Sequence, residues 1–354
     1  MKISKIPGLG TYGHFVDDLD FNTITEEEWM ELGRFHSKDL VTIIRNVNLP
    51  VDKFEPYINK WGKNTSLSNY NLLKKYNLSK FEEFSTIADQ IEENDKMRMD
   101  TNSRMVAAEI AKKTTVIRVT GKKDKNGMPL GLFGDGELDW HSNEAGQLCF
   151  GAGVALYGKA GMQGTATCFL TTTDWYESQS AAFKSELDDM ICLHKWTPGK
   201  INPGLTGWFD TIVGYNMCGN LEDTFEVPLV IKSPGGITGL HYSVNTLWGI
   251  KGMTQEEANR MFQHINKTLF VEKYMYDYWW PRNNDLLLFD NSICLHKRLG
   301  EVKNRLAYRI SYNMDKIETD LKNRYRQPEF NEKYLRQLKE IEQFMQNMHN
   351  DHSY

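Results

Sequence analysis

Residues 285–296 read DLLLFDNSICLH, an apolar run of strand length that leads through a polar turn to His296. Residues 138–144 read LDWHSNE and place His141 in a second strand-like segment, far away in the chain. Side chains alternate along a strand with period two, so we expect His141 and Asn143 on one side of their strand. A fold that brings two such distant strands together predicts a barrel or sandwich around the two histidines.

Other short apolar or β-branched segments predict further strands. The runs LCFGAGVALYG and ATCFLTTT flank Gly161–Gly164, which we interpret as a loop between paired strands. Residues 304–309, NRLAYR, are expected on the strand that follows His296. The remaining expected strands cover residues 40–44, 115–119, 228–232, 239–247, 285–290 and 305–313.

Helical patterns are fewer. Two capping boxes, Thr25 with Glu28 and Thr254 with Glu257, predict helix starts. Helices are expected after Thr25, at about 174–193 and at 254–269, and a polar, largely helical stretch is expected at about 51–113. After residue 314 the chain is charged and helical, with an apolar seam at Leu338, Ile341, Met345 and Met348. That seam predicts a helix packed on its own barrel or, alternatively, a helix that joins two copies of the chain.

These patterns predict a single domain that is mainly β with α additions. It would consist of an N-terminal α/β part at 1–113, a β core at about 114–313 and a C-terminal helical extension at 314–354. A chain of 354 residues is long enough to bury one large core with insertions.

The composition argues against several classes of protein. A net charge of −5 offers no concentrated cationic surface for a nucleic-acid backbone. No segment approaches the ~18 apolar residues of a membrane span, and the first residues contain no apolar signal segment, so we expect a cytoplasmic protein. Five scattered cysteines without a CxxC pair predict buried thiols rather than a zinc knuckle or disulfides.

Two histidines on strands that are far apart in the chain, His141 and His296, suit a non-haem iron site. Dioxygen activation at such iron usually uses two imidazoles and a carboxylate on one face of the metal, which leaves three positions for co-substrate and oxygen. Arg305 suits the distal carboxylate of 2-oxoglutarate, because a guanidinium keeps its charge and can bind a carboxylate through two N–H groups.

In the order of its motifs, the chain resembles the taurine dioxygenase family of the clavaminate-synthase-like oxygenases over about residues 115–313. The matching residues are Trp140-His141, Asp290-Asn291, His296, and Arg305 with Arg309, together with the turn at 280–285 and the loop at 164–167. The resemblance implies a double-stranded β-helix (jelly-roll) core, Fe(II) held by His141 and His296, and 2-oxoglutarate as co-substrate. It also implies that Arg305 and Thr167 hold the co-substrate, while Arg309 lies nearer the substrate.

The chain departs from this family at one metal position. Asn143 stands where the family has Asp or Glu, and Glu144 follows it. Three readings stay open: Asn143 is a ligand, a local bulge turns Glu144 inward, or water or an anion takes the position. An amide is neutral, so it would hold Fe(II) more weakly than a carboxylate. The family's halogenating relatives also lack the carboxylate, although they place a small residue there.

Other conspicuous residues have structural interpretations. Asp290-Asn291 is interpreted as hydrogen-bonding support for the strand that carries His296. Asp139 is interpreted as a solvent-facing or turn residue, and His241, on an expected core strand, is a candidate for a pocket role. The remaining interpretations are structural histidines at His194 and His264, surface or salt-bridge residues at Arg282 and Arg298, and core residues at Trp279 and Trp280.

The leading hypothesis is an Fe(II)/2-oxoglutarate-dependent dioxygenase that hydroxylates an unactivated carbon of a small polar substrate and releases succinate and CO2. Arg309 suggests an anionic group on that substrate. The alternatives are a non-catalytic, iron-deficient binding protein, which Asn143 favours, a halogenase-like variant, and a structural subunit that assembles through the C-terminal seam.

Overall fold

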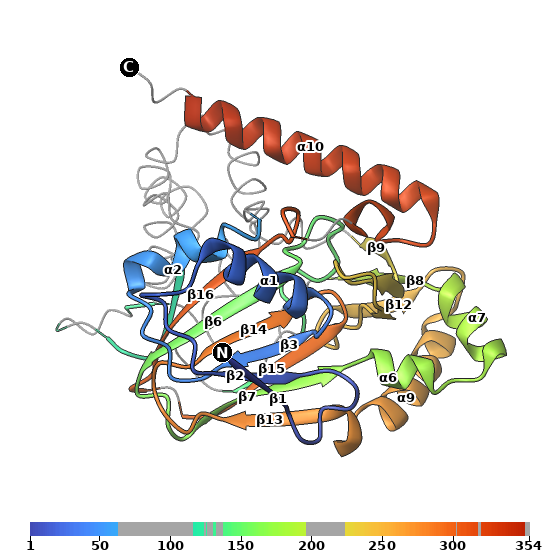
Figure 1. Cartoon of the computed structure of the whole chain (residues 1–354). Coiled ribbons are helices and arrows are strands. Elements are labelled where there is room, and N and C mark those ends of the chain that lie inside the picture. The colour runs from blue at the N-terminus through green and yellow to red at the C-terminus, as the bar shows by residue number, and fades with distance from the viewer. Residues whose placement is uncertain are drawn as a thin grey trace.

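Two sheets face each other, and the smaller one contains both strands that carry the predicted histidines (Figure 1). The computed structural model describes residues 1–62, 116–123, 125, 130–131, 137–195, 224–301, 303–317 and 320–350. The larger sheet consists, in spatial order, of β1 (Lys2–Lys5), β2 (His14–Asp17), β3 (Val41–Ile44), β14 (Leu286–Asp290), β6 (Gly153–Ala160), β16 (Leu306–Tyr312) and β4 (Ile117–Thr120). The smaller sheet consists of β13 (Met275–Trp279), β7 (Thr165–Thr171), β15 (Cys294–Gly300) and β5 (Leu138–His141). Described neighbours pair antiparallel, except that β2 runs parallel to β3.

The apolar strand β14 is buried on both of its faces. Leu287 and Phe289 belong to the cluster between the two sheets, where the ring centroids of Phe289 and Phe169 lie 5.2 Å apart. Leu286 and Leu288 belong to the cluster on the outer side of the larger sheet. Burial on both faces explains why this strand reads as a continuous apolar run rather than as an alternating one.

Helices α1 (Glu26–Ser37) and α2 (Val51–Ile58) cover the outer side of the larger sheet (Figure 1). The predicted capping box begins α1, because the Thr25 hydroxyl accepts from the Glu28 N–H and the Glu28 carboxylate accepts from the Thr25 N–H. Trp29 of α1 stacks on Trp61 at a centroid distance of 4.3 Å, and both rings are fully buried. Aromatic packing therefore fixes this layer.

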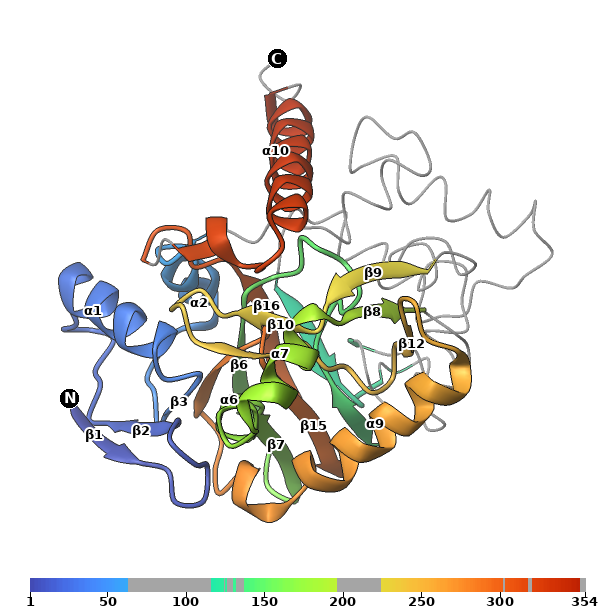
Figure 2. The same ribbon diagram turned by 90° about the vertical axis from the view of Figure 1, so that its right-hand side faces the viewer.

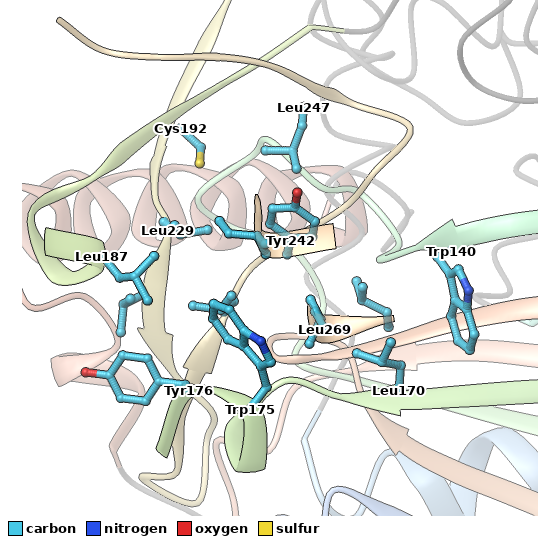
Figure 3. Packing of buried hydrophobic residues seen from close by; sticks show 14 of the residues in the cluster. Trp140, Leu170, Trp175, Tyr176, Leu187, Cys192, Leu229, Tyr242, Leu247 and Leu269 are labelled. Atoms are coloured by element: carbon cyan, nitrogen blue, oxygen red, sulfur yellow. The ribbon is translucent and has the colours of Figure 1, made fainter. Parts of the chain in front are cut away.

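Helices α6 (Thr173–Glu177), α7 (Ala181–Asp189) and α9 (Gln255–Leu269) cover the outer side of the smaller sheet (Figure 2). Their apolar side chains form one cluster with the strands, in which Trp175 and Leu269 accompany Leu170 of β7 (Figure 3). The capping box of Thr254 and Glu257 begins α9, as predicted.

Two shorter sheets extend this side of the molecule, and they correct several predictions. They consist of β8 (Ile191–His194) between β9 (Phe225–Pro228) and β12 (Leu247–Ile250), and of β10 (Val230–Lys232) with β11 (Thr238–Leu240). The predicted helix at 174–193 is confirmed only in part, because the region forms two helices, α6 and α7. Ser180 caps the second of them, and the apolar segment from Ile191 forms the strand β8 instead. The predicted strand at 239–247 is wrong in its middle, because β11 ends at Leu240.

The loop Gly161–Gly164 does not join paired strands. It connects β6 of the larger sheet to β7 of the smaller sheet, so it passes between the two layers. The prediction of a hairpin here is wrong, because the pattern of two apolar runs around a glycine loop does not reveal which sheet each run joins.

The C-terminal helix α10 (Pro328–Asn350) runs along one end of the molecule (Figure 1). Ile341 of the predicted seam is fully buried in a cluster with Phe150 and Tyr325, and Leu338 packs against the same cluster. This part of the helix therefore packs on its own chain. The side chains of Met345 and Met348 lie outside the described residues, so self-association stays a prediction.

The remaining described elements are the 3-10 helices η1 (Glu272–Tyr274) and η2 (Asp320–Asn323). The described cysteines, Cys149, Cys168, Cys192 and Cys294, are buried and free of disulfides, while Cys218 lies outside the described residues. The expected helical stretch is described only as far as residue 62, and residues 63–113 lie outside the description. No helix in the described part of the chain combines the length and apolar character of a membrane span.

Candidate active site

The two predicted histidines lie side by side. His141 ends β5 and is the register partner of His296 on β15, and their ring centroids are 4.2 Å apart. Nδ1 of His141 donates to the carbonyl oxygen of Asp139 at 2.6 Å, which leaves the lone pair on Nε2. Burial lowers the pKa of His141 to about 4 and that of His296 well below its usual range. Both imidazoles are thus neutral near pH 7, which is the form that binds metal.

Asn143 lies in a turn rather than on a strand, so the strand pattern did not predict how it is positioned. The strand β5 ends at His141 and Asn143 lies in the following turn, so the argument from strand alternation does not apply. Nη1 of Arg309 nevertheless donates to Oδ1 of Asn143 at 3.2 Å, and Nδ2 of Asn143 has no described hydrogen-bond partner. The amide is therefore held beside the histidines by β16.

Asn291 fixes the backbone of this turn. Its Oδ1 accepts from the N–H of Asn143 at 2.8 Å, and its Nδ2 donates to the carbonyl oxygens of Asn143 and Gly151 at 3.0 and 2.9 Å. Asp290 in turn accepts from the N–H groups of Ser292 and Ile293. The two residues support the strand that leads to the distal histidine, as the sequence predicted.

Glu144 also faces the interior. Its backbone is left-handed, with φ of 57°, a conformation that non-glycine residues rarely adopt. Its Oε2 accepts from the N–H of Gly151 at 3.1 Å. Burial lowers the pKa of Arg309, and the nearby Glu144 carboxylate partly offsets that shift. Both carboxamide and carboxylate thus lie next to Arg309, and the identity of a third metal ligand stays open.

Two buried arginines, Arg298 and Arg305, lie close together near the C-terminal end of β15. Arg305, which immediately precedes β16, is 2% exposed, and its Nε and Nη1 have no hydrogen-bond partner within the described residues. Burial lowers the pKa of Arg305 to about 9, with a further contribution from Arg298. Oγ1 of Thr167 accepts from Nε1 of Trp280 at 3.0 Å. Arg305 remains a cation near pH 7, in a place that solvent does not reach.

Arg298 is buried, so the surface part of its interpretation as a surface or salt-bridge residue is wrong. It is 4% exposed and is the register partner of Thr167. The available signal was its position two residues after His296, which puts both side chains on one face of the strand. Arg282, in contrast, is half-exposed and lies 3.9 Å from a carboxylate oxygen of Asp285, as the salt-bridge interpretation predicted.

The other singled-out residues lie elsewhere. His241 is fully buried, donates from Nδ1 to the carbonyl oxygen of Ser292 at 3.0 Å and stacks on Phe150. His194 lies on a strand rather than in a helix, with its ring centroid 5.7 Å from that of His241. Asp139 is exposed, as predicted, and His264 is also exposed. Trp280 is buried, as predicted, but the core interpretation of Trp279 is wrong. Trp279 is 53% exposed because it lies on the face of β13 opposite to the buried Tyr278.

No cluster of three His, Cys, Asp or Glu side chains suitable for a metal occurs in the described part of the chain. A third protein ligand to a metal held here would therefore be the amide oxygen of Asn143 or, after a movement, Glu144. The residues present still fit a divalent cation, because two neutral imidazoles and an amide oxygen are metal donors.

Comparison with known proteins relates this fold to oxygenases. A crystal structure of AAD-2 in complex with Mn(II) and N-oxalylglycine matches with a TM-score of 0.59 at 15% identity, over 88% of this chain and 96% of that chain. A taurine dioxygenase from Burkholderia xenovorans matches with a TM-score of 0.55 at 15% identity, over 88% of both chains. A putative α-ketoglutarate-dependent 2,4-D dioxygenase from the same organism matches with a TM-score of 0.55 at 12% identity, over 88% of this chain and 97% of that chain.

No family model matches the chain, and no curated protein matches its sequence. The resemblance to taurine dioxygenase is thus confirmed at the level of the fold, which is mainly β with helical additions.

Proposed function

We propose that the protein is a non-haem Fe(II)/2-oxoglutarate-dependent dioxygenase built on a double-stranded β-helix core. Its substrate would be a small polar or anionic molecule that is hydroxylated at an unactivated carbon, with succinate and CO2 as co-products. The fold shared with a taurine dioxygenase and with a putative α-ketoglutarate-dependent dioxygenase supports the reaction class, while the site residues support the cofactors.

One observation carries the proposal. Arg305 is buried, its Nε and Nη1 have no described partner, and two neutral histidines lie side by side on β5 and β15. A desolvated cation without a partner is unfavourable, so the site favours an anion that reaches it. A dicarboxylate with a 2-oxo acid end for the metal and a distal carboxylate for Arg305 meets both requirements.

The roles of the side chains follow from their positions. His141 and His296 would hold Fe(II), with Asn143 or Glu144 as the third protein ligand. When bound, the iron would supply oxygen activation coupled to oxidation of the co-substrate. Arg305 and Thr167 would orient the distal carboxylate, and Arg309 would hold Asn143 and face the anionic group of the substrate. The covered sheets would exclude bulk water from the reacting groups.

A non-catalytic binding protein is the second candidate, because the neutral Asn143 supplies no charge to a metal. A halogenase-like variant would need an anion at the position of the missing carboxylate. Assembly through the C-terminal helix and a cytoplasmic location are further parts of the proposal, and they rest on the sequence alone.

Anaerobic titration with Fe(II), with and without 2-oxoglutarate, tests the proposal. We expect a visible charge-transfer band only when both are present, because it requires the co-substrate to chelate the iron. Binding of 2-oxoglutarate without iron would favour the binding protein. Failure to bind either ligand would exclude the oxygenase.

A further inference from the structure

Tyr312 is a buried tyrosine on the strand that also carries Arg309. It follows Arg309 by three residues, so its side chain projects from the opposite face of β16, into the apolar cluster on the outer side of the larger sheet. Its ring lies against Gly153, where an added Cβ would be only 2.8 Å from the phenolic oxygen. The phenol is therefore held in one position, behind the strand that orients Asn143.

The Tyr312 hydroxyl begins a chain of hydrogen bonds that leads away from the candidate active site. The Thr42 hydroxyl donates to Oδ2 of Asp39 at 3.1 Å, so its oxygen accepts from Nδ1 of His36 at 3.0 Å. Nε2 of His36 thereby keeps its lone pair and accepts from the Tyr312 hydroxyl at 2.8 Å. Each group in this chain can pass a proton to the next one, in the direction from Tyr312 to Asp39.

Asp39 is suited to receive that proton at the end of the chain. Burial raises the pKa of this carboxyl group, whereas burial lowers the pKa of His36 to about 3. The imidazole therefore hands a proton on rather than keeping it. Oδ1 of Asp39 accepts from Nδ1 of His14 at 2.5 Å, and the His14 side chain is 26% exposed. The relay thus leads from a buried phenol toward a residue that solvent reaches.

Aromatic rings connect Tyr312 to the surface by a second route. The ring centroid of Tyr312 lies 5.9 Å from that of Trp61, which stacks on Trp29 at 4.3 Å. The Trp29 ring in turn lies 5.5 Å from that of Tyr57, which is partly exposed. Electrons move between aromatic rings at such separations in short steps. A one-electron oxidant in solution can therefore reach Tyr312 through these rings.

We propose that Tyr312 is a redox-active tyrosine, which gives one electron to a one-electron oxidant while its phenolic proton enters the relay. The O–H bond of Tyr312 breaks, and Nε2 of His36 takes the proton while Nδ1 releases its own. That second proton goes to Thr42, whose hydroxyl proton moves to Asp39. The products are a neutral tyrosyl radical, a protonated Asp39 and the reduced oxidant, so atoms and charge balance.

The inference rests on the proposed function only for the natural oxidant, which oxygen activation at the candidate iron site would supply when no substrate is bound. The relay and the rings belong to the chain itself. They can therefore be tested without iron, with an oxidant of known chemistry.

The test uses the metal-free, full-length protein and a ruthenium(III) tris-bipyridine oxidant, generated by a light flash with a cobalt(III) electron acceptor. Rapid freezing and electron paramagnetic resonance then detect tyrosyl radicals. We expect a persistent radical in the wild-type protein and its loss in Tyr312→Phe. Tyr242→Phe is the matched control and should keep the signal, because Tyr242 is also buried but donates to the amide oxygen of Asn266 at 2.7 Å, which takes no proton.

His36→Gln tests the relay separately from the phenol. The glutamine oxygen can accept the hydrogen bond from Tyr312 but cannot take its proton, so the radical should be lost although the phenol remains. Labelling the histidines of the wild-type protein with a nitrogen isotope makes the test independent of how well the variants fold. We expect the radical to couple magnetically to an imidazole nitrogen.

A wild-type protein that forms no tyrosyl radical would overturn the proposal, as would a radical that persists in Tyr312→Phe or in His36→Gln. A wild-type radical without coupling to an imidazole nitrogen would do the same. Because the experiment contains no iron, these failures leave the proposed function untouched. Conversely, a protein that binds neither Fe(II) nor 2-oxoglutarate but forms the Tyr312 radical would refute the proposed function alone.

Discussion

Nη1 of Arg309 donates a hydrogen bond of 3.2 Å to Oδ1 of Asn143, the oxygen available for a metal. An amide oxygen has two lone pairs, so this contact orients the amide and still leaves one lone pair for a cation. A carboxylate in this position would also neutralise part of the Arg309 charge, whereas the amide leaves that task to Glu144. The interior is therefore more cationic than that of a site with two histidines and a carboxylate.

Arg305→Ala should weaken the binding of 2-oxoglutarate by about 2–4 kcal/mol, because the bound distal carboxylate would lose its charged partner in a desolvated pocket. Iron affinity should stay the same, since Arg305 is not among the proposed metal ligands. Equilibrium dialysis with labelled 2-oxoglutarate checks the first expectation and Fe(II) titration the second. Wild-type affinity for the co-substrate would show that another residue, such as Arg309, holds the carboxylate.

His296→Ala should abolish iron retention and any formation of succinate while the fold survives. The imidazole supports the metal more than the core, because its Nδ1 has no hydrogen-bond partner in the described part of the chain. Anaerobic dialysis against Fe(II), together with circular dichroism, measures both effects. Lys297→Ala on the other face of β15 serves as the control. Retention of wild-type iron affinity would remove His296 from the site.

Acid should destabilise the protein through His36, a buried histidine of α1 that is not among the proposed metal ligands. Nδ1 of His36 contacts the Thr42 hydroxyl at 3.0 Å and Nε2 contacts the Tyr312 hydroxyl at 2.8 Å, and burial lowers the pKa of His36 to about 3. The unfolded chain protonates this group near its ordinary value of 6.5. Between these two values the unfolded state binds more protons, so stability falls as the pH decreases.

His36→Gln should therefore flatten the pH dependence of the unfolding free energy by up to about 1.4 kcal/mol per pH unit between about pH 6 and pH 4. Urea unfolding at several pH values measures this slope. His264→Gln, on the exposed side of α9, should leave the slope unchanged. Equal slopes in His36→Gln and the wild-type protein would contradict the prediction.

Short sequence patterns correctly predicted those helices and strands that depend only on residues close together in the chain. The capping boxes at Thr25 and Thr254 began helices because the side chain and backbone groups that define them are three residues apart. The segment at Ile191 was mistaken for helix because a short apolar run fits either period, and its pairing with β9 and β12 depends on distant residues.

The sequence predicted those residues of the candidate site that belong to a recognisable motif. It did not predict residues whose position depends on how strands far apart in the chain align. His141 and His296 are adjacent, as the motifs indicated. The burial of Arg298, interpreted as a surface or salt-bridge residue, was not predicted, because its place opposite Thr167 depends on how β15 aligns with β7. Asn143 reached the expected side for a different reason, the hydrogen bond from Arg309 across to the turn after β5.

The Fe(II) affinities of two variants, Asn143→Asp and Glu144→Gln, show which residue is the third metal ligand. If Asn143 coordinates the metal, Asn143→Asp adds a negative charge between the cation and Arg309 and should tighten Fe(II) binding about tenfold, or about 1.4 kcal/mol. Glu144→Gln should then have little effect. We expect this pattern, because Oδ1 of Asn143 is already oriented by Arg309, while Glu144 accepts from the Gly151 N–H.

If Glu144 is the ligand, the outcomes reverse. Glu144→Gln would lose most of the metal affinity, and Asn143→Asp would be neutral or harmful because two carboxylates would crowd one cation. Gln is preferred to Ala because it keeps an acceptor for the Gly151 N–H, whereas Glu144→Ala would leave that donor unsatisfied at a cost of about 1–3 kcal/mol in stability. Anaerobic Fe(II) titration of both variants separates the two cases. Unchanged affinity in both would indicate a metal held by His141 and His296 alone, with water or an anion in the third position.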